Sequence, residues 1–386
     1  MDRKVYLLTI VSFVVGMAEL IIGGILDLIA DDLHISIGRA GLLITVFSLV
    51  FAIGAPILLA LTAGIERKRL TLMALAVFFI GNLLVVISHT FLILFFARIV
   101  SALSGSLLAV LCMTLAPNIV SRQFTGRAIG LVIMGTSASL VLGVPLGLLI
   151  GSTYGWRAPF ILIAALTLVV AFGVQRFMGR IEPAQAIPLK EQLKTLKKRK
   201  ILFAQFTMFF YLAGHLAVYA YLTPFVKTAL HLNAGWTSSV YFVFGIAAVC
   251  GGGFSGLLTD RLGAGRVILT VIVMMACALF SLPYAAKSIL LFFIVLVVWG
   301  MMSWSITPAL QSYLIEIAPG TAAIQQSLNN SALHFGIAFG SLAGGVVAEK
   351  SSVLHTPAAG GILILISLAA ACMSMAGKRQ ALKKAS

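Results

Sequence analysis

Charge is scarce in this chain, and so are the polar stretches that a water-soluble protein needs. Only 10% of the 386 residues are charged, while 61% are hydrophobic. A soluble fold of this length could not bury that much apolar surface, so the composition excludes a water-soluble enzyme or binding protein. The solvent around most of this chain is therefore lipid.

Cysteine and the ingredients of catalytic sites are also rare. The four cysteines fall far apart in apolar stretches, which is typical of small core residues and not of a disulfide or metal set: Cys112, Cys250, Cys277 and Cys372. No His, Cys and Glu cluster has metal-ligand spacing, no nucleophile has an evident base, and no P-loop is present. We therefore expect no metal, no other cofactor, no direct use of ATP and no enzymatic activity.

Long apolar runs fill the chain instead. About twelve of them are roughly 20 residues long, the length at which a helix crosses ~30 Å of hydrocarbon. Helix is favoured over strand because lipid cannot satisfy unpaired backbone amides and because no period-two alternation occurs. The predicted spans are 5–30, 40–62, 70–88, 91–115, 128–151, 158–178, 201–226, 236–258, 266–285, 288–312, 325–348 and 357–377.

Acidic residues number 11 against 27 Lys and Arg, which gives a formal net charge of +16. Such basicity can indicate nucleic-acid binding, but most of these residues gather in alternate loops between the spans. The asymmetry predicts an even number of spans, with both termini in the cytoplasm. We interpret the charge as a topology signal and an attraction to anionic lipid headgroups, with no nucleic-acid partner.

The chain is interpreted as a duplication of one six-span half. A polar linker at 179–200 separates an N-terminal half, 1–178, from a C-terminal half, 201–386. Small residues at every fourth position let helices approach closely in lipid. Span five and its counterpart, span eleven, both carry them: Gly135, Ser139, Gly143, Gly147 and Gly151, then Gly336, Gly340 and Gly344. Each glycine alone predicts only ordinary packing, but the repetition predicts two similar halves.

A loop motif recurs in both halves. After span eight, residues 256–263 read GLLTDRLG, whereas after span two only the basic residues 67–69 match, and Ala63 replaces the acid. Twelve spans in two halves with this loop resemble the major facilitator superfamily. The resemblance implies a fold with the substrate between the halves near the bilayer midplane. It also implies that Asp260 and Arg261 help to gate the cytoplasmic side.

Two span motifs strengthen this resemblance. In span four, Arg98 with Ala102, Gly105 and Ala109 is similar to the arginine motif of the superfamily. In span five, residues 143–147 (GVPLG) resemble a loose form of the motif that marks antiporters. Pro145 within it removes one backbone hydrogen bond and can kink the helix, which suits a gating element.

Segments along the whole chain are similar to the purine-base and nucleoside efflux pumps of Bacillus-type bacteria, in the drug:proton antiporter branch. They are 16–20 (GMAEL), 212–215 (LAGH), 219–221 (YAY), 299–304 (WGMMSW), 311–319 (QSYLIEIAP) and 324–327 (IQQS). The resemblance implies proton-coupled export of purines from a bacterial cell, across its plasma membrane. We expect a monomer. Asp27 departs from the pattern, since related chains usually have proline there.

Ionisable groups at membrane depth are candidates for function, because inserting each costs about 2.5–3.5 kcal/mol. Glu19 lies near the middle of span one, beside Ser12, Gly16 and Gly23, which leave room for water or substrate. It could exchange a proton near neutral pH, or it could stay protonated or permanently paired with Arg98. Arg98 keeps its proton, so it would balance a carboxylate or only join helices.

Spans seven, ten and eleven supply the candidate substrate groups. His215 could take part in proton coupling or be a neutral hydrogen-bonded ring, and Tyr219, one turn later, could stack on a flat ligand. Further candidates are Trp304, Gln311, Asn329, Asn330 and His334, whose polar atoms could bind the edge of a neutral base. The alternative for these residues is ordinary packing and interhelical hydrogen bonding, worth about 0.6–2 kcal/mol each.

The leading interpretation is a proton-coupled exporter of purine bases or nucleosides that works by alternating access. A multidrug or sugar exporter of the same architecture is the nearest alternative. A membrane-embedded enzyme would need a reactive group with a paired base, and a receptor would usually add a soluble domain. Asp27, Asp31 and Asp32, towards the outer end of span one, are expected to be solvated.

Overall fold

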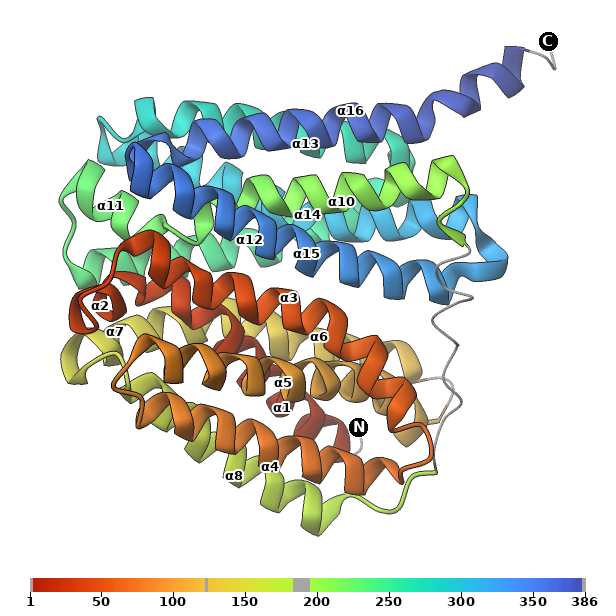
Figure 1. Ribbon diagram of the computed structural model, residues 1–386. Coiled ribbons are helices and arrows are strands. Elements are labelled where there is room, and N and C mark those ends of the chain that lie inside the picture. The colour runs from red at the N-terminus through yellow and green to blue at the C-terminus, as the bar shows by residue number, and fades with distance from the viewer. Residues whose placement is uncertain (1–2, 122–123, 183–194, 384–386) are drawn as a thin grey trace. The chain divides into compact units, whose positions relative to one another are not determined.

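The computed structural model describes residues 3–121, 124–182 and 195–383, and within these ranges every regular element is a helix (Figure 1). Twelve helical segments are long and apolar enough to cross a membrane, which confirms the predicted all-α fold with twelve spans. Part of the predicted linker lies outside the described residues, as do four basic residues behind the charge asymmetry: Arg122, Lys190, Lys194 and Lys384.

The chain divides into two compact units. Unit 1 comprises Met1–Ala186 and Asn233–Phe242, and unit 2 comprises Ile187–Leu232 and Val243–Ser386. The helices up to residue 186 are α1 (Arg3–Gly24), α2 (Leu26–Asp32), α3 (Ile37–Leu61), α4 (Arg67–Val86), α5 (Phe91–Ile119), α6 (Thr125–Ala138), the π-helical η2 (Ser139–Gly143), α7 (Val144–Tyr154) and α8 (Ala158–Phe177).

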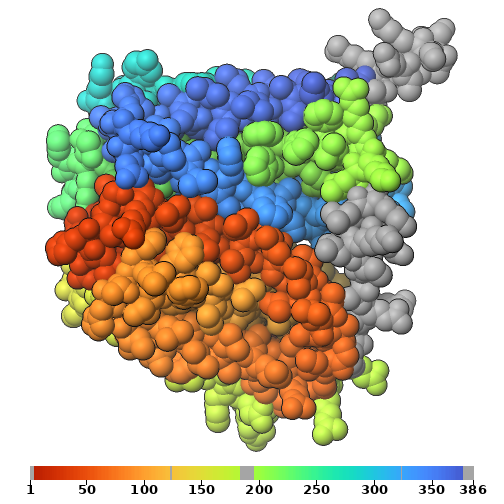
Figure 2. Space-filling view, in the orientation of Figure 1, coloured from red at the N-terminus to blue at the C-terminus, as the bar shows by residue number. Residues whose placement is uncertain are grey.

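The remaining helices complete the C-terminal six spans. They are α10 (Arg199–Tyr219), α11 (Leu222–Leu230), α12 (Ala234–Leu262), α13 (Ala264–Ala285), α14 (Ile289–Ile317), the 3-10 turn η3 (Pro319–Thr321), α15 (Ala322–Lys350), the 3-10 turn η4 (Val353–His355) and α16 (Thr356–Lys383). Within each unit, side chains close the spaces that the ribbon leaves between neighbouring helices (Figure 2).

Side chains at helix starts account for several boundaries. The Ser36 hydroxyl accepts a hydrogen bond from the backbone N–H of Arg39 (3.1 Å) and so caps α3. The Thr90 hydroxyl caps α5 through the N–H of Ile93 (3.4 Å). Between α12 and α13 the chain reverses at Gly263, whose φ of 84° suits glycine because it has no Cβ. These local signals move the boundaries a few residues from those predicted by hydrophobicity alone.

Spans one and seven are interrupted, although the sequence predicted them to be continuous over 5–30 and 201–226. The first breaks at Ile25 (φ −113°, ψ 18°) and the other at Tyr221 (φ −113°, ψ 17°). The N–H of Ile25 is shared between the carbonyls of Ile21 and Ile22, both at 3.2 Å. Hydrophobic periodicity does not detect such a tightened turn, because the apolar side chains continue through it. The matching backbone angles support a duplicated six-span unit.

The small-residue stripes lie where helices make their closest contacts. A Cβ added to Gly135 in span five would collide with the Thr9 carbonyl of α1. In the second copy, a Cβ on Gly340 of α15 would collide with the Ala213 carbonyl of α10. Span five therefore packs on span one as span eleven packs on span seven, and in both pairs the missing side chains permit backbone contact.

Candidate functional site

The polar centre of unit 1 is formed by Glu19 of α1 and Arg98 of α5. Arg98 is fully buried, and its Nη1 donates to the carbonyl oxygen of Ala18 at 2.8 Å. Its guanidinium carbon lies 4.0 Å from the ring centroid of Phe47 in α3, which is a cation–π contact. The Glu19 carboxyl interacts electrostatically with this guanidinium. The structure thus brings the two predicted residues together and adds Phe47, which no local sequence pattern indicated.

The Arg98 side chain can donate more hydrogen bonds than it makes in this structure. Its Nε and Nη2 atoms are buried and make no hydrogen bond within the described part of the chain. A guanidinium stays charged, and a buried charge is costly unless it is compensated. Protonation of Glu19 would remove the negative partner of this charge and leave the Ala18 carbonyl and the Phe47 ring beside it. The pair can therefore convert gain of one proton into a large local electrostatic change.

In unit 2, four rings from three helices form a buried aromatic cluster: His215 and Tyr219 of α10, Phe244 of α12 and Trp299 of α14. The Trp299 indole Nε1 donates to His215 Nδ1 at 3.1 Å. Phe244 stacks on His215 with ring centroids 5.9 Å apart and lies 5.0 Å from the rings of both Tyr219 and Trp299. Accepting this bond means that His215 carries no proton on Nδ1.

Sequence reasoning found half of this cluster. His215 and Tyr219 were predicted, whereas Phe244 and Trp299 were missed as site residues. The sequence feature that could have indicated these two residues is Gly300. A Cβ added to Gly300 would lie 2.9 Å from the Ala247 side chain and from the Phe244 carbonyl. A glycine beside a tryptophan within a span marks a close helix crossing that turns the indole inward. In the described arrangement Tyr219 packs against its neighbours, so a stacked ligand would have to displace one of them.

A buried amide network joins α10 to α15. Asn329 Nδ2 donates to Gln205 Oε1 at 3.0 Å, and Gln205 Nε2 donates to the Gln325 carbonyl at 3.3 Å. Of the two interpretations given to Asn329, interhelical bonding describes this contact. Neighbouring Asn330, by contrast, is exposed. Gln205 was missed, because a glutamine near a helix start carries no distinctive pattern.

The other predicted substrate groups are spread over α14 and α15. Trp304 and Gln311 are half-buried, and His334 is buried. The Trp304 Cβ lies against α12, about a van der Waals contact from where Gly252 would carry a Cβ (3.7 Å). These three residues are thus distributed along two helices and do not belong to the four-ring cluster.

The predicted gating residues occupy two different environments. Asp260 and Arg261 are exposed in the last turn of α12. Pro145 is buried and lies two residues after the end of the π-helical turn η2. A π-helical turn interrupts the regular hydrogen bonds of an α-helix, and such turns are frequent at functional sites.

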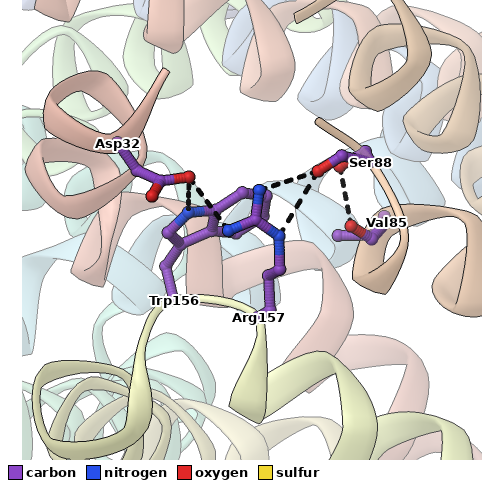
Figure 3. A network of polar contacts seen from close by, with 5 residues as sticks. All are labelled: Asp32, Val85, Ser88, Trp156 and Arg157. Carbon is purple, nitrogen blue, oxygen red and sulfur yellow. Dashed lines mark hydrogen bonds and ion pairs between the residues drawn. The ribbon is translucent and has the colours of Figure 1, made fainter. Parts of the chain in front are cut away.

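A polar network connects three loops of unit 1 (Figure 3). Asp32 Oδ2 accepts from the Trp156 indole and from Arg157 Nη1, both at 2.9 Å. Arg157 Nη2 also donates to the Ser88 carbonyl at 2.8 Å. The expectation of solvated carboxyl groups was wrong for Asp27, which is buried. Asp31 and Asp32 are exposed as expected, and Asp32 also pairs with residues more than a hundred positions away. Loop contacts of this kind cannot be read from local sequence.

The loop after span two carries a carboxylate outside the motif, Glu66. Glu66 caps α4 by accepting from the N–H groups of Lys68 and Arg69, both at 2.9 Å. The same carboxylate accepts from the Ile181 N–H at 3.0 Å, and the Arg67 N–H donates to the Ile181 carbonyl at 3.0 Å. A carboxylate three residues beyond Ala63 therefore joins this loop to the segment that follows α8.

The family follows from comparison of the sequence. The profile described as Major Facilitator Superfamily matches residues 8–341. The chain belongs to the major facilitator superfamily. It is 35% identical over 381 residues to the uncharacterized MFS-type transporter YbcL of Bacillus subtilis (strain 168), covering 98% of each chain. It is 26% identical over 366 residues to a probable sugar efflux transporter of Helicobacter pylori (strain G27), covering 95% of this chain and 93% of that one.

The fold agrees with this membership. A bacterial homologue of the human lysosomal transporter Spinster, solved in an inward-facing and unoccupied conformation, superposes with a TM-score of 0.75. The match covers 97% of this chain and 98% of that chain at 15% identity, which is a likeness of fold alone. The protein is therefore a multi-pass membrane transporter of this superfamily, whose members named here are transporters and not enzymes.

Proposed function

We propose that this transporter exports purine bases or nucleosides in exchange for protons, by alternating access. The observation that carries the proposal is the pair formed by half-buried Glu19 and fully buried Arg98. A membrane-embedded carboxyl beside a permanent cation has two states, charged and protonated, and they differ strongly in local electrostatics. Two orientations that expose this carboxyl to opposite sides would solvate it differently, so protonation would favour one of them.

The cargo assignment is supported by the type of groups in unit 2. Purines are flat, neutral near pH 7 and rimmed with donors and acceptors, so aromatic faces and amide edges suit them better than a counter-ion. Tyr219, Trp304 and the exposed Asn330 offer these groups. Tyr219 would stack on the base when the aromatic cluster opens, and Asn330 would form hydrogen bonds with the edge of the base.

The proposal also includes the location of the protein in the cell and the residues that gate it. We place the protein in a bacterial plasma membrane as a monomer, with both termini in the cytoplasm, because basic residues gather on that side. Asp260 and Arg261 would stabilise closure of the cytoplasmic side, and Pro145 with its preceding π turn would permit bending of span five. These roles follow from the superfamily resemblance of their motifs.

Export of sugars is the second candidate, and it has an observation of its own. The Helicobacter pylori relative is named a probable sugar efflux transporter and aligns over nearly its full length. Sugars also bind through aromatic faces and amides, so the same residues could serve. Multidrug export would instead require recognition of large apolar cations.

Accumulation in everted membrane vesicles tests the proposal directly. Vesicles with an acidic interior should take up radiolabelled adenine or guanosine in exchange for protons, but not lactose or ethidium. Tyr219→Ala should weaken purine binding by about 1–3 kcal/mol, the usual worth of stacking on a base. Tyr284→Ala is the matched control, since Tyr284 is exposed at the end of α13. Uptake of lactose or ethidium without purine uptake would show that the cargo assignment is wrong.

A further inference from the structure

A crevice of about 220 Å³ opens between α12, α13 and α14 within unit 2. Apolar side chains make up most of its wall, among them Phe254, Leu258, Val267, Met274 and Met301. Phe254 and Met274 are also well exposed at its edge, so the crevice continues into the apolar outer surface of these helices. An opening with such apolar walls favours hydrocarbon chains over water.

The two serine hydroxyls in the crevice already make hydrogen bonds. The Ser255 hydroxyl donates to the Ser305 carbonyl at 2.5 Å, and the Ser305 hydroxyl donates to the carbonyls of Gly251 (2.9 Å) and Met301 (2.6 Å). These bonds form where α12 and α14 cross closely, since a Cβ on Gly251 would collide with the Met301 backbone. A polar solute would therefore find few free hydrogen-bonding groups in the crevice, whereas an alkyl chain would gain apolar contact.

One end of the crevice carries positive charge. Leu262 and Val267 line that end, and each adjoins an exposed arginine: Arg261 precedes Leu262 and Arg266 precedes Val267. Among the described residues, neither guanidinium takes part in a hydrogen bond or an ion pair. Asp260 is the one acid in the turn between α12 and α13, so this turn carries two cations and one anion and is net positive. An apolar slot ending at free arginines is complementary to an amphiphile with an anionic head.

We propose that this crevice binds an anionic phospholipid, with one acyl chain between α12, α13 and α14 and the phosphate at Arg261 and Arg266. The volume exceeds the ~150 Å³ of an apolar cavity that holds benzene, so it accommodates a segment of an alkyl chain but not a whole lipid. Along α12 the lining runs from Gly251 to Leu262, roughly 16 Å at 1.5 Å per residue. The proposal is independent of the cargo and of proton coupling.

Native mass spectrometry of the purified full-length protein tests this site. Equal amounts of phosphatidylglycerol and phosphatidylcholine with the same acyl chains are supplied, and bound lipid is counted after mild detergent removal. The wild type should retain one phosphatidylglycerol in preference to phosphatidylcholine. Arg266→Gln should lower that preference about fivefold, because one basic residue near a lipid headgroup contributes about that factor.

The second arm of the experiment places a bulky side chain inside the crevice. Thr270 lines the crevice and is exposed, so Thr270→Trp should fill it and reduce lipid retention by about tenfold, equivalent to displacing two buried methylenes. Val273→Trp is the matched control, because Val273 is exposed on the same helix but does not line the crevice. Its retention should equal that of the wild type.

The outcomes separate the possibilities, provided that the melting temperatures of both tryptophan variants match. Equal loss of lipid from Thr270→Trp and Val273→Trp would overturn the site. Equal retention of the two lipids by the wild type would overturn the anionic headgroup. If Thr270→Trp abolishes efflux while lipid retention is unchanged, the crevice is a passage for apolar cargo and the lipid proposal is wrong.

Discussion

The indole nitrogen of Trp299 in α14 donates a hydrogen bond to Nδ1 of His215 in α10 across 3.1 Å, although the two residues are 84 positions apart in the chain. An indole can only donate, so the imidazole must accept at this nitrogen. Full protonation of His215 would remove the acceptor and break the contact. The bond therefore couples the protonation of one predicted residue to the packing of the four-ring aromatic cluster.

A double-mutant cycle measures this coupling. Trp299→Phe keeps most of the ring packing but removes the donor, and His215→Phe removes the acceptor. The coupling free energy should be about 0.5–1.5 kcal/mol, the net worth of one buried hydrogen bond. Thermal unfolding in detergent of the wild type, both single variants and the double variant provides it. Strictly additive losses would show that the two residues only pack together.

Glu19→Gln should uncouple transport from protons. The amide keeps the size and hydrogen-bonding capacity of the side chain but cannot titrate, so uptake driven by a pH gradient should fall at least about tenfold, the general scale of losing an essential proton carrier. Exchange of substrate for substrate without a gradient should persist. Glu182→Gln, which changes an exposed acid of the same unit, should behave as the wild type. Undiminished gradient-driven transport by Glu19→Gln would sink the proton-coupling role.

Asp32→Asn should destabilise unit 1 in a pH-dependent manner. The Trp156 hydrogen bond, together with the hydrogen bond and charge of Arg157, lowers the pKa of Asp32. A lowered folded-state pKa contributes stability above the unfolded value of about 3.9, and that contribution is lost as pH falls through the folded pKa.

The loss at pH 7 should be no more than about 1 kcal/mol, because the ion pair is partly exposed and screened. Melting temperatures at pH 7 and near pH 3 measure it, and the difference between variant and wild type should shrink at the lower pH. Asp31→Asn, one residue earlier, is the matched control. A difference as large near pH 3 as at pH 7 would mean that the carboxylate charge is not its source.

Glu66→Ala should expose the backbone after α8. Burial raises the pKa of the Glu66 carboxyl, but the N–H donors of Ile181, Lys68 and Arg69 outweigh it, so the pKa stands below its usual value. Removing this carboxylate leaves three N–H groups without their acceptor and should cost about 1–2 kcal/mol, as for a lost helix cap. Trypsin should then cleave faster after Arg180, whereas Glu182→Ala should not change the rate. An unchanged rate in Glu66→Ala would show that this loop contact does not protect the segment.

Asp260→Asn should slow turnover more than Ala63→Asp improves it. The second-half loop carries its acid within the motif, whereas the first-half loop uses Glu66 for a different purpose, capping α4 and bonding Ile181. Gating on the cytoplasmic side should therefore depend on Asp260. Transport rates of both variants at equal protein level measure this. If Asp260→Asn turns over like the wild type, the gating role is wrong.

The sequence alone determined the number and type of the spans, because lipid forces every backbone amide into helical hydrogen bonds and leaves hydrophobic length as a direct signal. It also predicted Glu19, Arg98 and His215 as candidate site residues, since ionisable residues at membrane depth are rare. The small-residue stripes predicted a duplication, and Gly135 and Gly340 of these stripes both stand where another helix backbone arrives.

Only the tertiary structure decided which of these residues meet. Phe47 lies under Arg98, Trp299 bonds His215, and Gln205 holds Asn329, each across long sequence separations. The breaks at Ile25 and Tyr221 likewise arise from local hydrogen-bond geometry that leaves the hydrophobic pattern unchanged. Periodicity shows which face of a helix avoids lipid, but the partner on that face depends on how helices cross, and helix crossing is a property of the packed bundle.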